Sequence, residues 1–334
     1  MADLKTAISE IVTGLGMCGG DDLVSALDVQ PPALRNVDDA TWQRLRDAWG
    51  NGLHRDLFVA SWMNGRAFLH ARDALRGRTP IVVEWKGPHR SIGDEAVPAD
   101  LRVDHVYVVS CKYLSRIVVN ASPEHLFDRL LKGGHGQRTG IDWYDEVAAP
   151  EHAALYAVVR DSVPIPLPDS VGDLTTEQRR DLGHSYERGS AWPGDGDRLY
   201  AQLVEQVAAA SALRWREAVG AKREAMLWRL LRIGSAPYFV LGASAKGFMR
   251  LRIATPWDWR QHFELRKFSI EPRAGGQPMI GWEAIVRRRA DGGEMPVRGY
   301  VEIRWSHRRF GAPPEAKVHL ETPHSEVPGY FVLD

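Results

Sequence analysis

Cysteine, net charge and long apolar runs are scarce or missing in this chain of 334 residues. Its 2 cysteines, Cys18 and Cys111, form neither a disulfide framework nor a zinc motif, which fits a reducing cytoplasm. No apolar run approaches the roughly 18 residues of a membrane-spanning helix. The amphipathic N-terminus contains acids, unlike a signal peptide. The sequence therefore predicts a cytoplasmic protein with no membrane partner.

The charge balance limits the range of functions further. The 43 Lys and Arg residues are matched by 43 Asp and Glu, so no overall field attracts a polyanion, and affinity for nucleic acid has to come from local basic patches. The sequence contains no internal repeat of the kind that marks a solenoid. Its length suffices for two domains, or for one domain with large insertions.

Reactive side chains gather in a β-rich stretch in the first half of the chain. Residues 80–86 and 105–109 are rich in Val, Ile and Tyr, which favour strands, and both runs are too short for helices. Asp104, Ser110 and Lys112 are separated by even numbers of residues, so one continuous strand directs all three to the same face of a sheet. The pattern predicts a site that combines an acid with a lysine.

This combination suits chemistry on phosphate groups. Carboxylates bind hard divalent cations such as Mg²⁺, and a bound cation lowers the pKa of a bound water and offsets charge on phosphate. Asp100, at the start of the same stretch, and Glu84, on the preceding strand, are further candidate ligands. The simpler alternative is a surface strand with a solvated lysine and an acid in a turn.

The stretch resembles the motif of the PD-(D/E)XK nuclease superfamily, in which an acid is followed, after a gap, by acid-x-lysine on a strand. Pro98-Ala99-Asp100 or Asp104 stands at the first acid, and Ser110-Cys111-Lys112 stands at the acid-x-lysine. The serine departs from the family pattern, which has Glu or Asp there, and Glu84 on the neighbouring strand would restore the ligand. The resemblance covers residues 55–133, with a matching order of helix, three strands and helix.

The resemblance implies metal-dependent hydrolysis of a phosphodiester in nucleic acid, with DNA as the expected substrate and a role in restriction, anti-phage defence or repair. It makes Asp104 the principal Mg²⁺ or Mn²⁺ ligand, with Asp100 or Glu84 assisting. Lys112 would orient or activate water, and Ser110 would occupy the position of the lost acid.

Two other readings stay open. The serine at position 110 favours a nuclease fold that has lost its chemistry and serves as a nucleic-acid-binding or assembly subunit of a larger complex. A protein-interaction subunit with a tryptophan-rich docking surface is the other alternative. Protein partners, and a homodimer, are compatible with each reading.

The predicted fold is an α/β, restriction-endonuclease-like mixed sheet flanked by helices, with helical additions and a C-terminal antiparallel β module. A short strand at 238–242 follows the long helix of 197–232, and we expect it to return to the central sheet as its last strand. The predicted parts are an N-terminal helical region, the nuclease-like core, a helical insertion and the β module, at 1–78, 79–133, 134–235 and 236–334.

Basic residues in the β module are candidate phosphate contacts. Arg287, Arg288 and Arg289 are consecutive, and Arg304 and Arg308 follow in the next segments. Tryptophans lie between them, where they either stack on unpaired bases or, more often in a small β module, form the core.

Three further segments are candidates for the site. The loop 87–100 carries His89, Arg90, Asp94 and Glu95, which suit phosphate contacts or simple solvation. The glycine-rich loop 134–140 is either a binding loop or a linker. In the resembled fold the helix before the first strand sometimes adds a polar residue, and His70 and Asp73 are the candidates, although ordinary surface roles are the commoner explanation.

Overall fold

The computed structural model divides the chain into two compact units, which are described separately. Unit 1 consists of Met1–Arg116, Arg232–Phe263 and His324–Asp334, and unit 2 of Ile117–Leu231 and Glu264–Pro323. The structure describes residues 3–87, 99–113, 117–131, 142–186, 191–234, 238–244, 247–273, 275–306 and 308–334. Among these residues, no helix has both the length and the apolar character to cross a membrane.

Unit 1 is built on a mixed sheet of seven strands in the order β1-β2-β3-β4-β6-β7-β12. Strands β2 (Val83–Trp85), β3 (Leu101–Val103) and β4 (Tyr107–Tyr113) form an antiparallel meander. Strand β6 (Tyr238–Ser244) then pairs with β4 in parallel, so the predicted return to the sheet is confirmed. It is not the last strand, because β7 (Gly247–Ile253) and β12 (Tyr330–Val332) extend the sheet beyond it.

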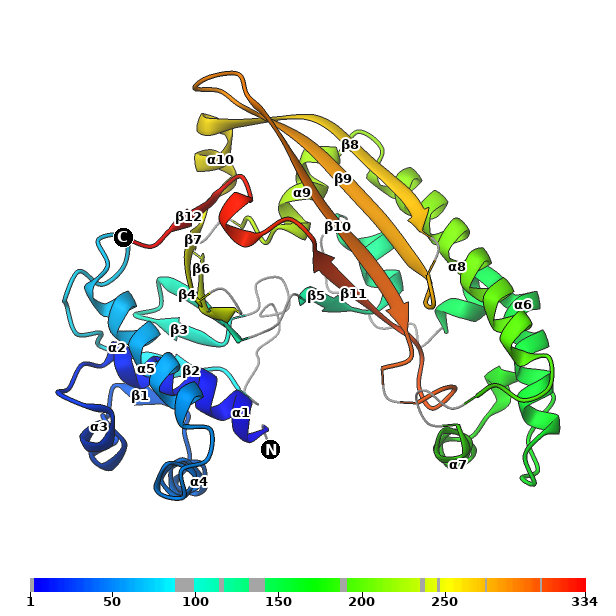
Figure 1. Cartoon of the computed structure of the whole chain (residues 1–334), viewed down its shortest axis with the longest axis horizontal. Helices are drawn as coiled ribbons and strands as arrows, with labels where there is room; N and C mark the ends of the chain where they lie inside the picture. The colour runs from blue at the N-terminus through cyan, green and yellow to red at the C-terminus, as the bar shows by residue number, and fades with distance from the viewer. Residues whose placement is uncertain are drawn as a thin grey trace. The chain divides into compact units, whose positions relative to one another are not determined.

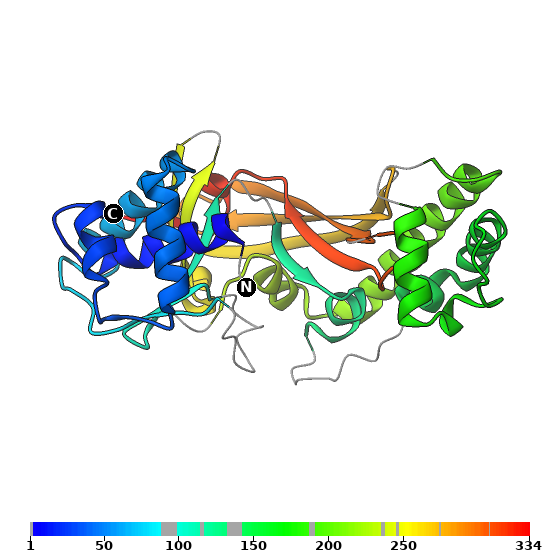
Figure 2. The same cartoon turned by 90° about the horizontal axis from the view of Figure 1, so that it is seen from below.

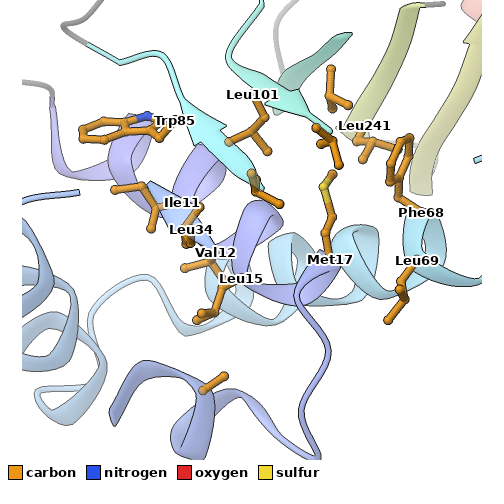
Figure 3. Packing of buried hydrophobic residues seen from close by; sticks show 14 of the residues in the cluster. Ile11, Val12, Leu15, Met17, Leu34, Phe68, Leu69, Trp85, Leu101 and Leu241 are labelled. Carbon is orange, nitrogen blue, oxygen red and sulfur yellow. The ribbon is translucent and has the colours of Figure 1, made fainter. Parts of the chain in front are cut away.

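Two helical segments cover one face of this sheet (Figure 1). One is the continuous segment formed by α1 (Leu4–Ala7), the π-helical turn η1 (Ile8–Val12) and α2 (Thr13–Met17), and the other is α5 (Arg55–His70). Figure 3 shows apolar side chains of these helices meeting those of the strands in one cluster. The remaining elements of unit 1 are β1 (Leu34–Arg35), α3 (Leu23–Val29), α4 (Asp39–Gly50), α10 (Pro256–His262) and η4 (His324–Glu326).

Glycine allows α2 and α5 to cross at close range. A Cβ atom on Gly65 would lie 2.1 Å from the carbonyl oxygen of Thr13, and one on Gly16 would lie 2.5 Å from that of Trp62. Both distances are far below van der Waals contact. The close crossing brings the first helical segment onto strands β2 and β4, where the candidate site lies.

Unit 2 is an antiparallel sheet of five strands in the order β5-β11-β10-β9-β8. Its long strands run side by side in Figure 2. The strands are β5 (Ile117–Ala121), β8 (Phe263–Arg273), β9 (Met279–Arg288), β10 (Glu294–Arg304) and β11 (Glu315–Leu320). The helices are η2 (His125–Arg129), α6 (Trp143–Asp161), η3 (Val171–Asp173), α7 (Thr176–Ser185), α8 (Gly196–Val219) and α9 (Arg223–Leu230).

The domain boundaries differ from those the sequence suggests. The β-branched run at 117–121 belongs to the sheet of unit 2, where β5 pairs with β11, and not to the core strands. The N-terminal helices and strands β6 and β7 belong to one unit, and the helical insertion forms another unit with β8–β11. The long helix predicted at 197–232 is two helices, because Gly220 adopts a positive φ of 44° between α8 and α9.

Candidate functional site

Asp100 is the acid that the fold brings to the Ser110-Cys111-Lys112 strand. It immediately precedes β3, is 6% exposed, and its Oδ2 atom accepts hydrogen bonds from Ser110 Oγ at 2.9 Å and from the Cys111 N–H at 2.6 Å. The backbone pairing of Asp100 N with Val109 O at 2.9 Å fixes this register. Of the two first acids that the motif allows, Asp100 is therefore the one beside position 110.

Ser110 is fully buried, and its hydroxyl forms hydrogen bonds with two side chains. Besides Asp100, it bonds with the Tyr238 hydroxyl, whose pKa burial raises to about 12 while the bond to Ser110 works in the opposite direction. Lys86, only 8% exposed, follows β2 and stands opposite Asp100, and its N–H donates to the Asp100 carbonyl oxygen at 2.9 Å. Position 110 thus belongs to a closed polar network.

Glu10 is a second buried carboxylate near the same strand. It lies in the π-helical turn η1, is 7% exposed, and its Oε2 atom accepts a hydrogen bond from Trp85 Nε1 at 2.6 Å. Burial raises the pKa of the Cys111 thiol well above its usual range, and the negative charges of Asp100 and Glu10 raise it further. Both carboxylates therefore lie close enough to act on Cys111, and the thiol is held in its neutral form.

A cleft of about 660 Å³ opens at the end of β4, inside unit 1. Its walls come from the first helical turns, from the turn that enters α5 and from the last residues of β4. They are Lys5, Thr6, Ser9, Glu10, Gly52, His54, Arg55, Asp56, Leu57, Cys111, Lys112 and Tyr113. Lys112 and Glu10 thus border one cavity whose volume lies within the range of ligand-binding pockets.

A buried network on the helix-covered face holds the end of β4. Asn64 of α5 donates to the Tyr113 hydroxyl and to the Gly242 carbonyl oxygen, both at 2.9 Å. Its own Oδ1 atom accepts from Arg250 Nε at 2.9 Å. Because Lys112 pairs with Gly242 in the parallel β4–β6 ladder, these bonds also fix the backbone from which the lysine projects.

The expected grouping of Asp104 with Lys112 is wrong. Val103 pairs with Tyr107, so Asp104 lies in the β3–β4 turn. Lys112 lies five residues after Tyr107 on β4, about 16 Å from the turn at the usual rise of a strand. The two residues share parity, but the chain turns between them, so an even spacing does not place them on one face of a continuous strand. Asp104 instead accepts from the Ile81 N–H at 2.7 Å and pairs with Arg78 at 2.6 Å.

Glu84 does not restore a ligand group at position 110. It pairs with Arg102 across the β2–β3 ladder, and its Oε2 atom is 3.8 Å from His105 Nδ1, near the hairpin turn. Among the described residues, no three His, Cys, Asp or Glu side chains gather closely enough to hold a metal ion.

Asp104→Ala is expected to destabilise unit 1 by about 1–2 kcal/mol, since it removes the acceptor for two backbone N–H groups and the partner of a half-exposed arginine. Burial alone would raise the pKa of Asp104, but the Val82 N–H and Arg78 outweigh it and lower the pKa. A depressed folded pKa stabilises above the unfolded pKa, so the stability difference should shrink as the pH falls below about 4. Urea unfolding from pH 3 to 7 measures it, and a pH-independent difference would contradict this role.

The arginines proposed to contact nucleic acid do not form one surface, and Arg308 lies beside Gly183 of α7. Arg287 lies opposite Glu294 in the β9–β10 ladder, at one end of β10. Arg304 lies at the other end of β10, about 33 Å away along the strand. Arg304 pairs with Glu302 at 3.0 Å. At the hairpin tip Arg288 pairs with Asp291 at 3.1 Å. A hydrogen bond from Arg266, reinforced by the charges of Arg289 and Arg287, lowers the pKa of Glu264. Arg287, Arg288 and Arg289 thus form a basic cluster near this tip.

The other sequence candidates have simpler roles. Trp282 and Trp305 are at most 8% exposed, so they are core residues of unit 2, as expected for a small β module. Helix α10 of unit 1 carries the other two tryptophans of the predicted module, of which Trp259 is buried and Trp257 is 71% exposed. Asp73 pairs with Arg252 at 3.2 Å, a surface contact away from the cleft. Most of the loop 87–100, including His89, Arg90, Asp94 and Glu95, and the whole of the loop 134–140 lie outside the described residues.

Sequence reasoning missed Glu10, Lys5 and Arg55. The π-helical turn buries all of residues 8–12, so an α-helical period does not identify Glu10 as buried. The available signal in the sequence was an acid, Glu10, placed among the apolar residues Ile8, Ile11 and Val12. Lys5 of α1 and Arg55 of α5 are 50 residues apart in the sequence and line the same cleft only in the folded chain.

Comparison with known proteins gives no relative. No family model matches the chain, and neither a curated protein nor a solved structure does.

Proposed function

We propose that this protein hydrolyses phosphodiester bonds in nucleic acid, with DNA as the expected substrate, in a metal-dependent reaction of the PD-(D/E)XK type. The observation that carries the proposal is the contact of Asp100 with the Ser110-Cys111-Lys112 strand beside the cleft. An acid that enters one strand next to an acid-x-lysine position on its antiparallel neighbour is the arrangement that the family motif requires.

The topology supports the same proposal. Helix α5 precedes the β2-β3-β4 meander, and β6 returns in parallel beside β4. This order is compatible with the proposed restriction-endonuclease-like core, with unit 2 residues inserted between β4 and β6. The helix expected after the strands, η2, belongs to unit 2 and gives the proposal no support. A restriction, anti-phage or repair role follows from the resemblance and is part of the proposal.

The donor set suits Mg²⁺ or Mn²⁺, which proteins commonly hold through one or two carboxylates together with water and substrate phosphate. Asp100 would hold the ion, and Glu10 is the second carboxylate near the same strand. A bound ion supplies Lewis acidity and an acidified water. Lys112 orients the attacking water and offsets charge on the phosphate, and the polar network around Asn64 keeps its strand in place.

Incubation of the purified chain with plasmid, linear duplex and single-stranded DNA tests the proposal. We expect cleavage with Mg²⁺ or Mn²⁺ and none in EDTA. Cleavage that survives EDTA would exclude the metal mechanism, and the same assay on RNA decides the substrate.

A second candidate is a nucleic-acid-binding or assembly subunit without cleavage. It is favoured by the polar network at position 110. Ser110 forms hydrogen bonds with Asp100 and Tyr238, and the backbone N–H of the buried Lys86 donates to the carbonyl oxygen of Asp100. The hydroxyl of Ser110 and the N–H of Cys111 satisfy the Oδ2 atom of Asp100 without any ion. Binding of DNA without cleavage under every divalent ion would favour it.

Replacement of Arg287, Arg288 and Arg289 by Ala is expected to weaken DNA binding several-fold at low salt and to flatten its salt dependence, because fewer counterions are released. Stability should change little, since the replaced side chains are exposed at the end of β9 and in the turn that follows it. Fluorescence anisotropy at salt concentrations from about 50 to about 200 mM measures the affinity for DNA and its salt dependence. The matched triple replacement by Lys keeps the charge and should keep the affinity; unchanged affinity in the Ala variant would place the binding surface elsewhere.

A further inference from the structure

We infer that the cleft of unit 1 binds a backbone phosphate adjacent to the one that is cleaved, through Lys5 and Arg55. The inference rests on the proposed nucleic-acid substrate and names the part of it that the cleft holds. The cleft is lined by Lys112, Cys111 and Tyr113 at the end of β4, and by Lys5 of α1 and Arg55 of α5.

The lining favours an anion over an apolar ligand. Lys5, Arg55 and Lys112 carry positive charge, and His54 adds a ring nitrogen. The acids in the lining are Glu10, which is buried and bonded to Trp85, and Asp56. With Glu10 engaged, the accessible charge is predominantly positive. Arginine and lysine together recognise phosphate through several charge-assisted hydrogen bonds.

Arg55 is positioned before any ligand arrives. Its guanidinium lies 4.9 Å from the centroid of the Trp49 ring, and Trp49 packs edge-on against Phe58 with centroids 5.4 Å apart. A guanidinium stacked on an aromatic ring keeps its N–H groups available for an acceptor that lies in the plane of the guanidinium. Less side-chain freedom is then lost when a phosphate binds.

The size of the cleft sets what enters it. A volume of about 660 Å³ suits a small ligand or a short piece of one strand. The occupant is thus one strand, held at a phosphate by Lys5 and Arg55 while a neighbouring phosphate reaches Lys112.

Binding of a fluorescent single-stranded DNA oligonucleotide to the whole chain in EDTA tests the inference without any need for cleavage. The Lys5→Ala/Arg55→Ala variant should bind about 10-fold more weakly at low salt, and the slope of log affinity against log salt should fall by about 0.7 for the one phosphate lost. The control Arg35→Ala/Arg72→Ala removes two exposed arginines of unit 1 that do not line the cleft and should bind as wild type. Lys5→Arg should retain the affinity.

The outcomes separate this inference from the proposed reaction. Wild-type affinity and slope in the Lys5→Ala/Arg55→Ala variant would overturn the phosphate site, even if the protein cleaves DNA. An equal loss in the control pair would overturn it too, because a general charge effect would then suffice. A selective loss in a protein that never cleaves would support the phosphate site and count against the nuclease proposal alone.

Discussion

Lys112→Ala and Asp100→Asn are each expected to reduce metal-dependent DNA cleavage by about 100-fold or more, and Asp100→Asn should leave the binding of DNA in EDTA little changed. Removal of one preorganised charged group from an active site commonly costs a factor of about 100 to 1,000. Lys112 borders the cleft, and Asp100 contacts the strand that carries it. Asparagine at position 100 retains an acceptor for Ser110 and Cys111 and removes only the charge.

Asp104→Ala is the matched control for these two variants. It removes a carboxylate from the same hairpin, but from the turn at the opposite end of β4. Once the fraction of folded protein is taken into account, its cleavage rate should equal that of the wild type. Full loss of cleavage in Asp104→Ala, with Asp100→Asn active, would reverse the site assignment. Activity in both Lys112→Ala and Asp100→Asn would remove the proposed reaction from this cleft.

Ser110→Glu is expected to make the stability of unit 1 depend on metal. In EDTA the new carboxylate lies beside the buried Asp100, and the cost should be about 3–5 kcal/mol, because a buried charge without a partner is strongly destabilising. If a divalent ion binds there, saturation at about 100 times its dissociation constant returns about 2.7 kcal/mol. Thermal unfolding with and without Mn²⁺ measures this difference, and restored ligation should also keep or raise cleavage.

Ser110→Gln supplies the control, since it has the size of glutamate without the charge. It should be destabilised by overpacking, and Mn²⁺ should not change its stability beyond the effect seen in the wild type. An equal metal response in both variants would come from another site. No metal response in Ser110→Glu would show that no ion reaches position 110, and the binding-only reading would then be the better one.

Local pattern was sufficient for most elements. Val, Ile and Tyr marked β2 and β4, and period-two runs separated by glycine turns marked β7 to β11. The return of residues 238–244 to the central sheet also followed from an apolar strand placed after a long helix. Pairing between distant segments was harder, because strand propensity does not encode the partner: the run at 117–121 pairs with β11 and not with β4.

The sequence by itself determined the mixed α/β class and that a lysine and several acids lie near one another along the chain. Only the tertiary structure decided which acid meets that lysine's strand. Asp104 matched in parity but lies beyond a turn, whereas Asp100 is brought to Ser110 by the antiparallel register. Glu10 and Arg55 reach the same cleft through the glycine-mediated crossing of two helices. Such contacts depend on three-dimensional packing, which a linear pattern does not specify.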